Sequence, residues 1–166
     1  MKKIEFYLNV LHFNIYKAHY RLHLLANKLN PFHLIHKLPF QKRRYEKLGI
    51  DIHKEIDKAF GNKNFGLSLI VAGGVLLGLF FFLFFSLIDL FISLFVEYKV
   101  LSASHLIFSG MLSIALSYFF VFKKDKYLMY FNQFEKWSKV EKRKYNWCTF
   151  GFITIILLLF VLNIVN

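Results

Sequence analysis

The chain has 166 residues, of which 57% are hydrophobic and 20% aromatic, and its formal net charge is +12. An ordinary soluble domain of this length is less apolar, so the composition predicts that part of the chain lies in a lipid bilayer. The single cysteine, Cys148, excludes an internal disulfide, and no cysteine cluster indicates a metal site.

Charged and apolar residues separate along the chain. Residues 1–64 hold 13 basic and 5 acidic residues, residues 65–122 hold 1 and 2, and residues 123–147 hold 8 and 3. We therefore expect an all-α integral membrane protein with three transmembrane helices. Its parts would be a basic amphipathic cytoplasmic region (1–64), a transmembrane hairpin (65–122), a cytoplasmic interfacial helix (123–147) and a third transmembrane helix (148–166).

The first thirty residues predict one long amphipathic helix. Apolar residues recur at alternating steps of four and three, which is a heptad pattern. The seam consists of Ile4, Leu8, Leu11, Ile15, Ala18, Leu22, Leu25 and Leu29. Phe6, Phe13 and Tyr20 form a second apolar side, so we expect two neighbours for this helix. The neighbours are either the rest of this region and the bilayer surface, or a second protomer.

Six of the seven histidines lie in residues 1–64. His19 with His23, and His33 with His36, have spacings that place two imidazoles on one helix face, which makes them weak candidates for metal ligands. No cysteine or acidic residue lies beside them in the sequence, so the alternative is an interfacial or pH-sensitive role. Further along, Asp51 after Gly49 is expected to cap an amphipathic helix that ends at Gly61.

Three apolar stretches follow, at residues 65–96, 100–122 and 148–166. About 20 apolar residues cross the roughly 30 Å hydrocarbon core, so each stretch is long enough to span it. Basic residues concentrate before the first stretch and between the second and third, which places these segments in the cytoplasm. We therefore expect the protein in the inner (plasma) membrane of the cell. Its N-terminus would lie in the cytoplasm and its C-terminus outside.

Small and polar residues form matching stripes on the first two spans. Glycine pairs and serines at helical spacing let helices approach closely and form hydrogen bonds. The expected helix-packing stripe contains Gly74, Gly78, Ser86, Ser93, Ser109, Ser113 and Ser117. Counting from a turn at Tyr98 places Ser113 level with Phe82, and Asp89 level with His105. An ionisable group in a bilayer needs a partner, so we expect Asp89 and His105 to pair, as a lock on the hairpin rather than a proton or ion path.

Residues 123–147 carry aromatic side chains on one side and lysines on the other. This pattern predicts an interfacial helix on the cytoplasmic leaflet, held by aromatic burial and by attraction to anionic lipids. Nucleic acid is a less favoured partner, because no phosphate-binding loop or RNA-binding motif accompanies the lysines.

No nucleophile motif, carboxylate pair or phosphate-binding loop is present, so we expect neither an enzyme nor a cofactor. The favoured function is a small membrane subunit or anchor that binds protein partners through cytoplasmic helices, within an oligomer or a larger envelope assembly of the secretion or transfer type. The alternative is a pore-forming or membrane-permeabilising effector. A weaker alternative is a metal- or pH-responsive membrane sensor.

Overall fold

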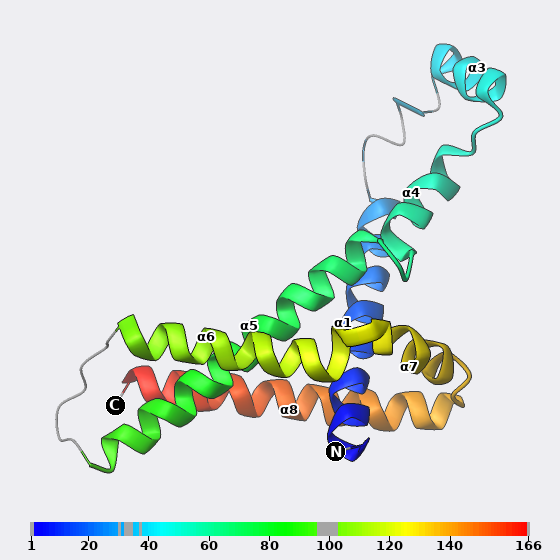
Figure 1. Cartoon of the computed structure of the whole chain (residues 1–166). Helices are drawn as coiled ribbons and strands as arrows, with labels where there is room; N and C mark the ends of the chain where they lie inside the picture. Colours follow the sequence, from blue (N-terminus) through cyan, green and yellow to red (C-terminus); the bar gives the residue numbers. More distant parts are fainter. Residues whose placement is uncertain (1, 30, 32–34, 37, 96–102, 166) are drawn as a thin grey trace. The chain divides into compact units, whose positions relative to one another are not determined.

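The computed structural model describes residues 2–29, 31, 35–36, 38–95 and 103–165. Every secondary-structure element among them is a helix (Figure 1). In chain order the elements are α1 (Lys2–Lys28), α3 (Pro39–Leu48), α4 (Ile52–Gly61), α5 (Leu67–Ser93), α6 (Ala103–Ser117), a π-helix (Tyr118–Phe122), a 3₁₀-helix (Lys123–Asp125), α7 (Lys126–Glu135) and α8 (Lys139–Val165). The expectation of an all-α fold is confirmed for these residues.

Three helical segments are long and apolar enough to cross a membrane, as predicted. They are α5, the run Ala103–Glu135 that contains α6 and α7, and α8. The protein is thus of the multi-pass membrane class by the length and composition of its helices. The third of these helices begins nine residues before Cys148, so basic residues assigned to the interfacial segment form the first turns of α8. The expected turn around Tyr98 lies outside the described residues.

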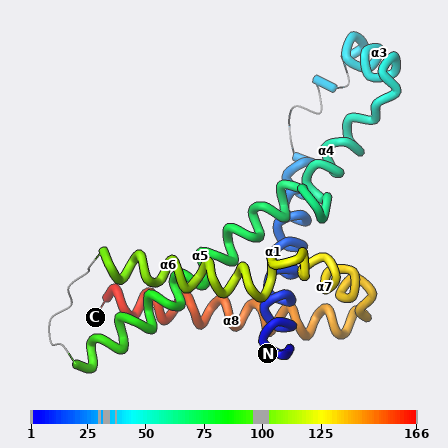
Figure 2. The backbone as a smooth tube through the Cα atoms, viewed as in Figure 1, coloured from blue at the N-terminus to red at the C-terminus, as the bar shows by residue number. Residues whose placement is uncertain are grey.

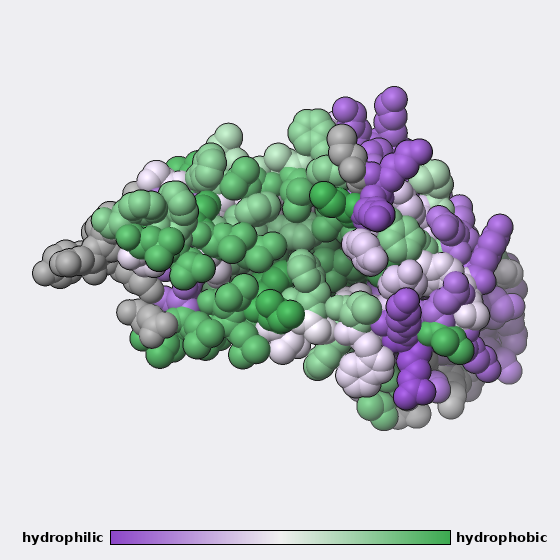
Figure 3. All heavy atoms as spheres, turned by 90° about the horizontal axis from the view of Figure 1, so that it is seen from below, coloured by the Kyte–Doolittle hydropathy of each residue, from purple (hydrophilic) through white to green (hydrophobic). Residues whose placement is uncertain are grey.

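The chain divides into two compact units, which are described separately. The first unit comprises Met1–Ile15 and Gly73–Asn166, and the second comprises Tyr16–Ala72. The boundary between them passes through α1 and α5. Figure 3 shows apolar side chains over the part of one face formed by α5, α6 and α8, and hydrophilic ones at the end where α7 and the start of α8 lie.

The first unit encloses the middle of α1. All five side chains from Asn9 to Phe13 are buried. Five successive residues at 3.6 per turn go more than once around a helix, so the protein covers α1 on every side here. The heptad seam is accordingly split: Leu11 and Ile15 are buried, whereas Leu22, Leu25 and Leu29 are 63%, 60% and 86% exposed. Within this chain only part of the seam is therefore buried, and its role in helix pairing stays a prediction.

The aromatic side of residues 123–147 packs against α1. The ring centroids of Phe13 and Phe131 are 5.1 Å apart, and those of Phe6 and Phe134 are 5.5 Å apart. Tyr127, Phe131 and Phe134 are buried. The expectation of one interfacial helix with its aromatic side on the leaflet is therefore wrong for these three residues. The segment is also broken after Glu135, because α7 and α8 are separate helices.

The second unit contains α3, α4 and the later part of α1. Gly49 ends α3 with a φ of 63°, a conformation that glycine adopts at no steric cost. Asp51 then caps α4 and accepts hydrogen bonds from the backbone N–H groups of His53 and Lys54, as the sequence predicts. The Tyr16 hydroxyl donates to the carbonyl of Gly61 at 2.6 Å, which joins α1 to the end of α4.

Candidate functional site

The serine stripe of α6 is buried inside the first unit. Ser109, Ser113 and Ser117 are all nearly inaccessible to solvent. The Ser109 hydroxyl donates to the carbonyl of His105 in its own helix, and the Ser113 hydroxyl donates to the carbonyl of Leu77 in α5, both at 2.7 Å. A serine hydroxyl that donates a hydrogen bond to the backbone carbonyl of a neighbouring helix is a packing contact. These three serines therefore face protein.

Counting from the turn placed Ser113 level with Phe82 of α5. Its hydroxyl instead donates to the carbonyl of Leu77, five residues earlier in α5. Figure 2 shows the reason: α5 and α6 cross at an angle, so matching residues by distance from the turn fails away from it. Asp89 and His105 are both half-buried. Their pairing stays a prediction.

The close approach of α5 to its neighbours occurs at Gly73. A Cβ atom built on Gly73 would lie 3.3 Å from Phe122 Cζ, whereas one built on Gly74 or Gly78 meets no atom of the described residues within 4 Å, its own helix backbone aside. The sequence stripe omitted Gly73 because the GxxxG spacing selects the other two. A packing role for Gly74 and Gly78 stays a prediction and would require another chain.

One polar residue joins α8 to α5 within the apolar stretch. Asn163 Nδ2 donates to the carbonyl of Ser86 at 2.8 Å. Nearby, the rings of Phe82 and Phe160 lie 4.4 Å apart. Ser86 itself is buried, whereas Ser93 is exposed and donates to the carbonyl of Leu90 in its own helix. Of the two α5 serines in the predicted stripe, one therefore lies in the interior.

A cluster of polar groups fastens α1 to the end of the second span. Asn9 Nδ2 donates to the carbonyl of Phe120 at 3.0 Å. Lys126 Nζ lies 2.8 Å from a Glu5 carboxylate oxygen and also donates to the carbonyl of Phe119. Tyr130 donates to the other Glu5 oxygen at 3.3 Å. We call Glu5, Asn9, Lys126 and Tyr130 the α1 latch.

The latch depends on the π-helix at Tyr118–Phe122. A π-helix widens the turn and disturbs the regular hydrogen bonding, and such segments often occur at functional sites. Here the carbonyls of Phe119 and Phe120 accept side-chain donors from α7 and α1. Sequence reasoning missed this cluster. Its one signal was the presence of Glu5 and Asn9 in an otherwise apolar stretch.

A second polar contact joins α1 to α8. Asn14 Nδ2 donates to the carbonyl of Tyr145 at 3.1 Å and to Thr149 Oγ1 at 2.8 Å. The imidazole of His12 lies in the same interior, with its ring centroid 5.2 Å from that of Phe131 and 5.5 Å from that of Phe122. The polar residues Asn9, His12 and Asn14 of α1 therefore take part in its contacts with the rest of the first unit.

Three of the four histidines proposed as metal ligands lie in the described residues, and each of these three has a different neighbour. His19 Nδ1 lies 3.0 Å from the Ser68 hydroxyl, His23 Nε2 lies 3.6 Å from an Asp57 oxygen, and His36 Nδ1 lies 3.0 Å from the Tyr45 hydroxyl. The described residues contain no group of three or more His, Cys, Asp or Glu side chains placed to hold a metal ion. His33 lies outside them.

Asp57 is an acidic neighbour of His23 in the structure. The two residues are far apart in the sequence, so sequence analysis did not reveal this contact. The imidazole of His23 also stacks on Phe60, with ring centroids 3.5 Å apart. Both contacts join α1 to α4 within the second unit. They give His23 a packing role, which is the simpler explanation of a histidine on this helix face.

Comparisons of the chain with protein-family models, with curated protein sequences and with solved structures found no match. We therefore infer the function from the residues and contacts described above.

Proposed function

We propose that the protein is a non-catalytic multi-pass membrane subunit or anchor that binds protein partners through helices on the cytoplasmic side. The supporting observation is that Ser109, Ser113 and Ser117 are buried within one chain and that the hydroxyls of Ser109 and Ser113 donate to backbone carbonyls. A helix that lined a water-filled pore would need this polar side accessible, because the remaining α6 surface is apolar. The pore-forming alternative is accordingly less favoured.

The partner surface that we propose is the exposed later half of the heptad seam. Leu22, Leu25 and Leu29 lie in the second unit with most of their side-chain surface uncovered, and large exposed apolar patches mark interaction sites. This interpretation places the partner, or a second copy within a secretion- or transfer-type envelope assembly, on the cytoplasmic side. The cytoplasmic assignment is based on the basic residues that flank the spans.

Site-specific photocrosslinking in cells tests the proposal. A photoreactive residue at Leu25 should give protein adducts, whereas the same residue at exposed Lys54 of α4 should give few. The adduct masses distinguish a homo-oligomer from a different partner. Absence of adducts at Leu22, Leu25 and Leu29 alike would count against a partner surface here.

A topology experiment tests the membrane orientation. With Cys148 replaced by serine, a cysteine at Asn64 should react with an impermeant thiol reagent only after permeabilisation, and a cysteine at Val165 should react in intact cells. The reverse pattern would overturn the orientation.

Liposome reconstitution separates the subunit from the pore. The purified protein should carry no ion flux. Stepwise single-channel currents that Ser113→Leu abolishes and Ser113→Ala retains would overturn the subunit proposal in favour of the effector.

A further inference from the structure

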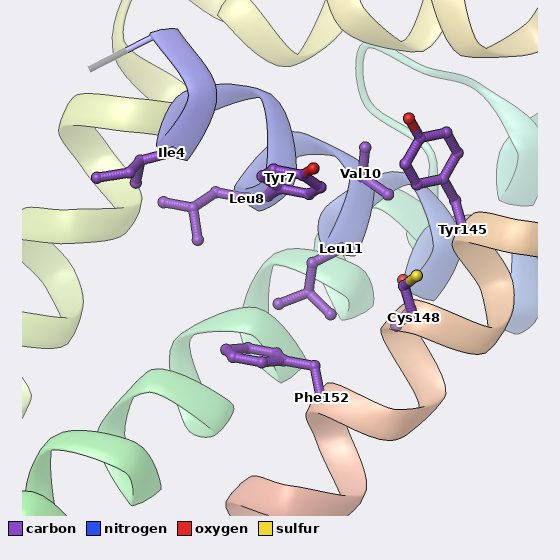
Figure 4. Close-up of a pocket in the computed structure, with 9 residues that line it drawn as sticks. Ile4, Tyr7, Leu8, Val10, Leu11, Tyr145, Cys148 and Phe152 are labelled. Atoms are coloured by element: carbon purple, nitrogen blue, oxygen red, sulfur yellow. The ribbon is translucent and has the colours of Figure 1, made fainter.

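An apolar cavity of about 390 Å³ lies between the first half of α1 and the start of α8 (Figure 4). Both walls belong to the first unit. Val10 and Leu11 are almost fully buried and form its floor, whereas Ile4, Tyr7 and Phe152 remain partly exposed at its rim. Figure 4 shows the side chains of Leu11 and Phe152 meeting from opposite helices.

The cavity is placed where the charged part of α8 gives way to its apolar part. Basic residues precede it at Lys142, Arg143 and Lys144, and the sequence from Tyr145 to Val165 contains no charged residue. Lys144 Nζ lies 5.7 Å from the centroid of the Tyr145 ring, which lines the cavity.

The other wall of the cavity also begins with basic residues. Lys2 and Lys3 are exposed and directly precede Ile4. The acidic residues nearby are already engaged: Glu5 pairs with Lys126 at 2.8 Å, and Glu141 accepts hydrogen bonds from Ser138. Basic residues therefore precede both walls of the apolar cavity, and we call those before Tyr145 (Lys142, Arg143 and Lys144) its basic margin.

We propose that this cavity binds an acyl chain of an anionic membrane phospholipid, whose phosphate lies against the basic residues at the start of α8. Burial of methylene groups favours the chain, and lysine and arginine beside a membrane attract anionic headgroups. Two polar atoms of the wall, the Tyr145 carbonyl oxygen and Thr149 Oγ1, already accept hydrogen bonds from Asn14.

The dimensions disfavour a helix of a second copy as occupant. Three turns of a helix with a diameter of about 10 Å occupy roughly 1,300 Å³, which is more than this cavity can hold. Small-molecule sites span about 300–1,000 Å³, a range that includes this cavity. A water-soluble ligand would need convergent polar groups in the wall, and these walls are apolar. An uncharged lipid would leave the basic margin without a counter-charge.

Native mass spectrometry of the full chain in mild detergent tests the proposal. Delipidated protein is titrated with phosphatidylglycerol or with phosphatidylcholine of the same acyl chains. We expect one phosphatidylglycerol to be retained with an affinity at least tenfold higher than phosphatidylcholine. Leu8→Trp, which fills the cavity, should weaken phosphatidylglycerol binding at least tenfold. Leu158→Trp, on the exposed side of α8, should leave it unchanged.

Two further measurements separate the acyl chain from the headgroup. Lys144→Gln should lower the phosphatidylglycerol affinity about fivefold and leave the phosphatidylcholine affinity unchanged. Cys148 lines the cavity and is the chain's one cysteine, so its alkylation by a maleimide should slow when phosphatidylglycerol is added and not when phosphatidylcholine is added. If Leu8→Trp does not fold, Cys148→Phe fills the same cavity from the α8 side.

Three outcomes would overturn the inference. Equal lipid retention by wild type and the cavity-filling variants would mean annular lipid only. Equal affinity for both lipids would exclude an anionic headgroup site. A dimer that Leu8→Trp dissociates, and that lipid does not affect, would mean that a second copy occupies the cavity.

Discussion

The enclosed part of α1 and the span α8 use their side chains in opposite ways. Five successive side chains of α1 are buried from Asn9 to Phe13, although this stretch contains an asparagine and a histidine. In α8 only 6% of the apolar stretch is buried, and Ile156 is the one buried residue of that helix. In this protein, high hydropathy indicates the helix whose side chains are compatible with lipid. Polar side chains with protein contacts indicate the helix that is buried inside the protein.

The largest effect should come from removing an aromatic side chain around α1. Phe13→Ala deletes a buried ring that contacts Phe131 and Phe134, and such truncations cost about 3–5 kcal/mol. Leu158→Ala on α8 removes a side chain that is 56% exposed, so it should cost much less. Unfolding by a denaturing detergent in mild micelles measures both. Equal losses would contradict the contrast between the two helices.

The three spans, the helical fold and the Asp51 cap could be predicted from the sequence. Each depends on local composition or on residues a few positions apart. The enclosure of α1 could not, because the partners of Phe13 and Asn9 lie more than a hundred residues away. The aromatic residues of α7 suit a bilayer interface and a protein interior equally well, so only the fold decides between them.

The same limit explains the errors in the predicted site. Ser113 was recognised as a packing residue, but its partner depends on the angle at which α5 crosses α6. The π-helix at Tyr118–Phe122 has no sequence signature, so the latch carbonyls of Phe119 and Phe120 were missed. The GxxxG pattern selected Gly74 and Gly78, whereas the neighbour that comes closest lies beside Gly73.

The second effect concerns the α1 latch. Asn9→Ala removes the donor to the Phe120 carbonyl in a buried site, and an unsatisfied buried group costs about 1–3 kcal/mol. Asn163→Ala on α8 is the matched control, because hydrogen bonds within a bilayer average about 0.6 kcal/mol. The same unfolding assay compares them. If Asn163→Ala is the more damaging change, polar contacts on α8 matter more than the latch.

The third effect tests whether the membrane hairpin also has a polar lock. Asp89→Ala should destabilise the protein, and adding His105→Ala should cost little more if the two side chains interact. Interhelical hydrogen bonds in membranes reach at most about 1.7 kcal/mol, which bounds the expected coupling. A double-mutant cycle measures it. Losses that simply add would show that Asp89 and His105 are independent.

The smallest effect concerns α4, an amphipathic helix that, unlike the middle of α1, has no buried residue. Its first turn should therefore depend on the Asp51 cap. The backbone N–H of Lys54 donates to this carboxylate and holds the pKa of Asp51 below its ordinary value of 3.8. A lowered pKa means that the ionised cap stabilises α4 above pH 3.8. The contribution is lost as the pH falls below that value through the folded-state pKa.

Amide exchange followed by NMR in micelles measures this contribution. Protection of the first-turn amides of α4 should fall below pH 3.8, while the enclosed amides of Val10 to Phe13 should not change with Asp51. Asp51→Ala should speed exchange in α4 already at neutral pH, whereas Asp51→Ser retains an N-cap oxygen that does not titrate and should remove the pH dependence. If α4 exchanges identically in all three proteins, its stability comes from packing, as in α1. The difference between an enclosed and a capped amphipathic helix would then not hold.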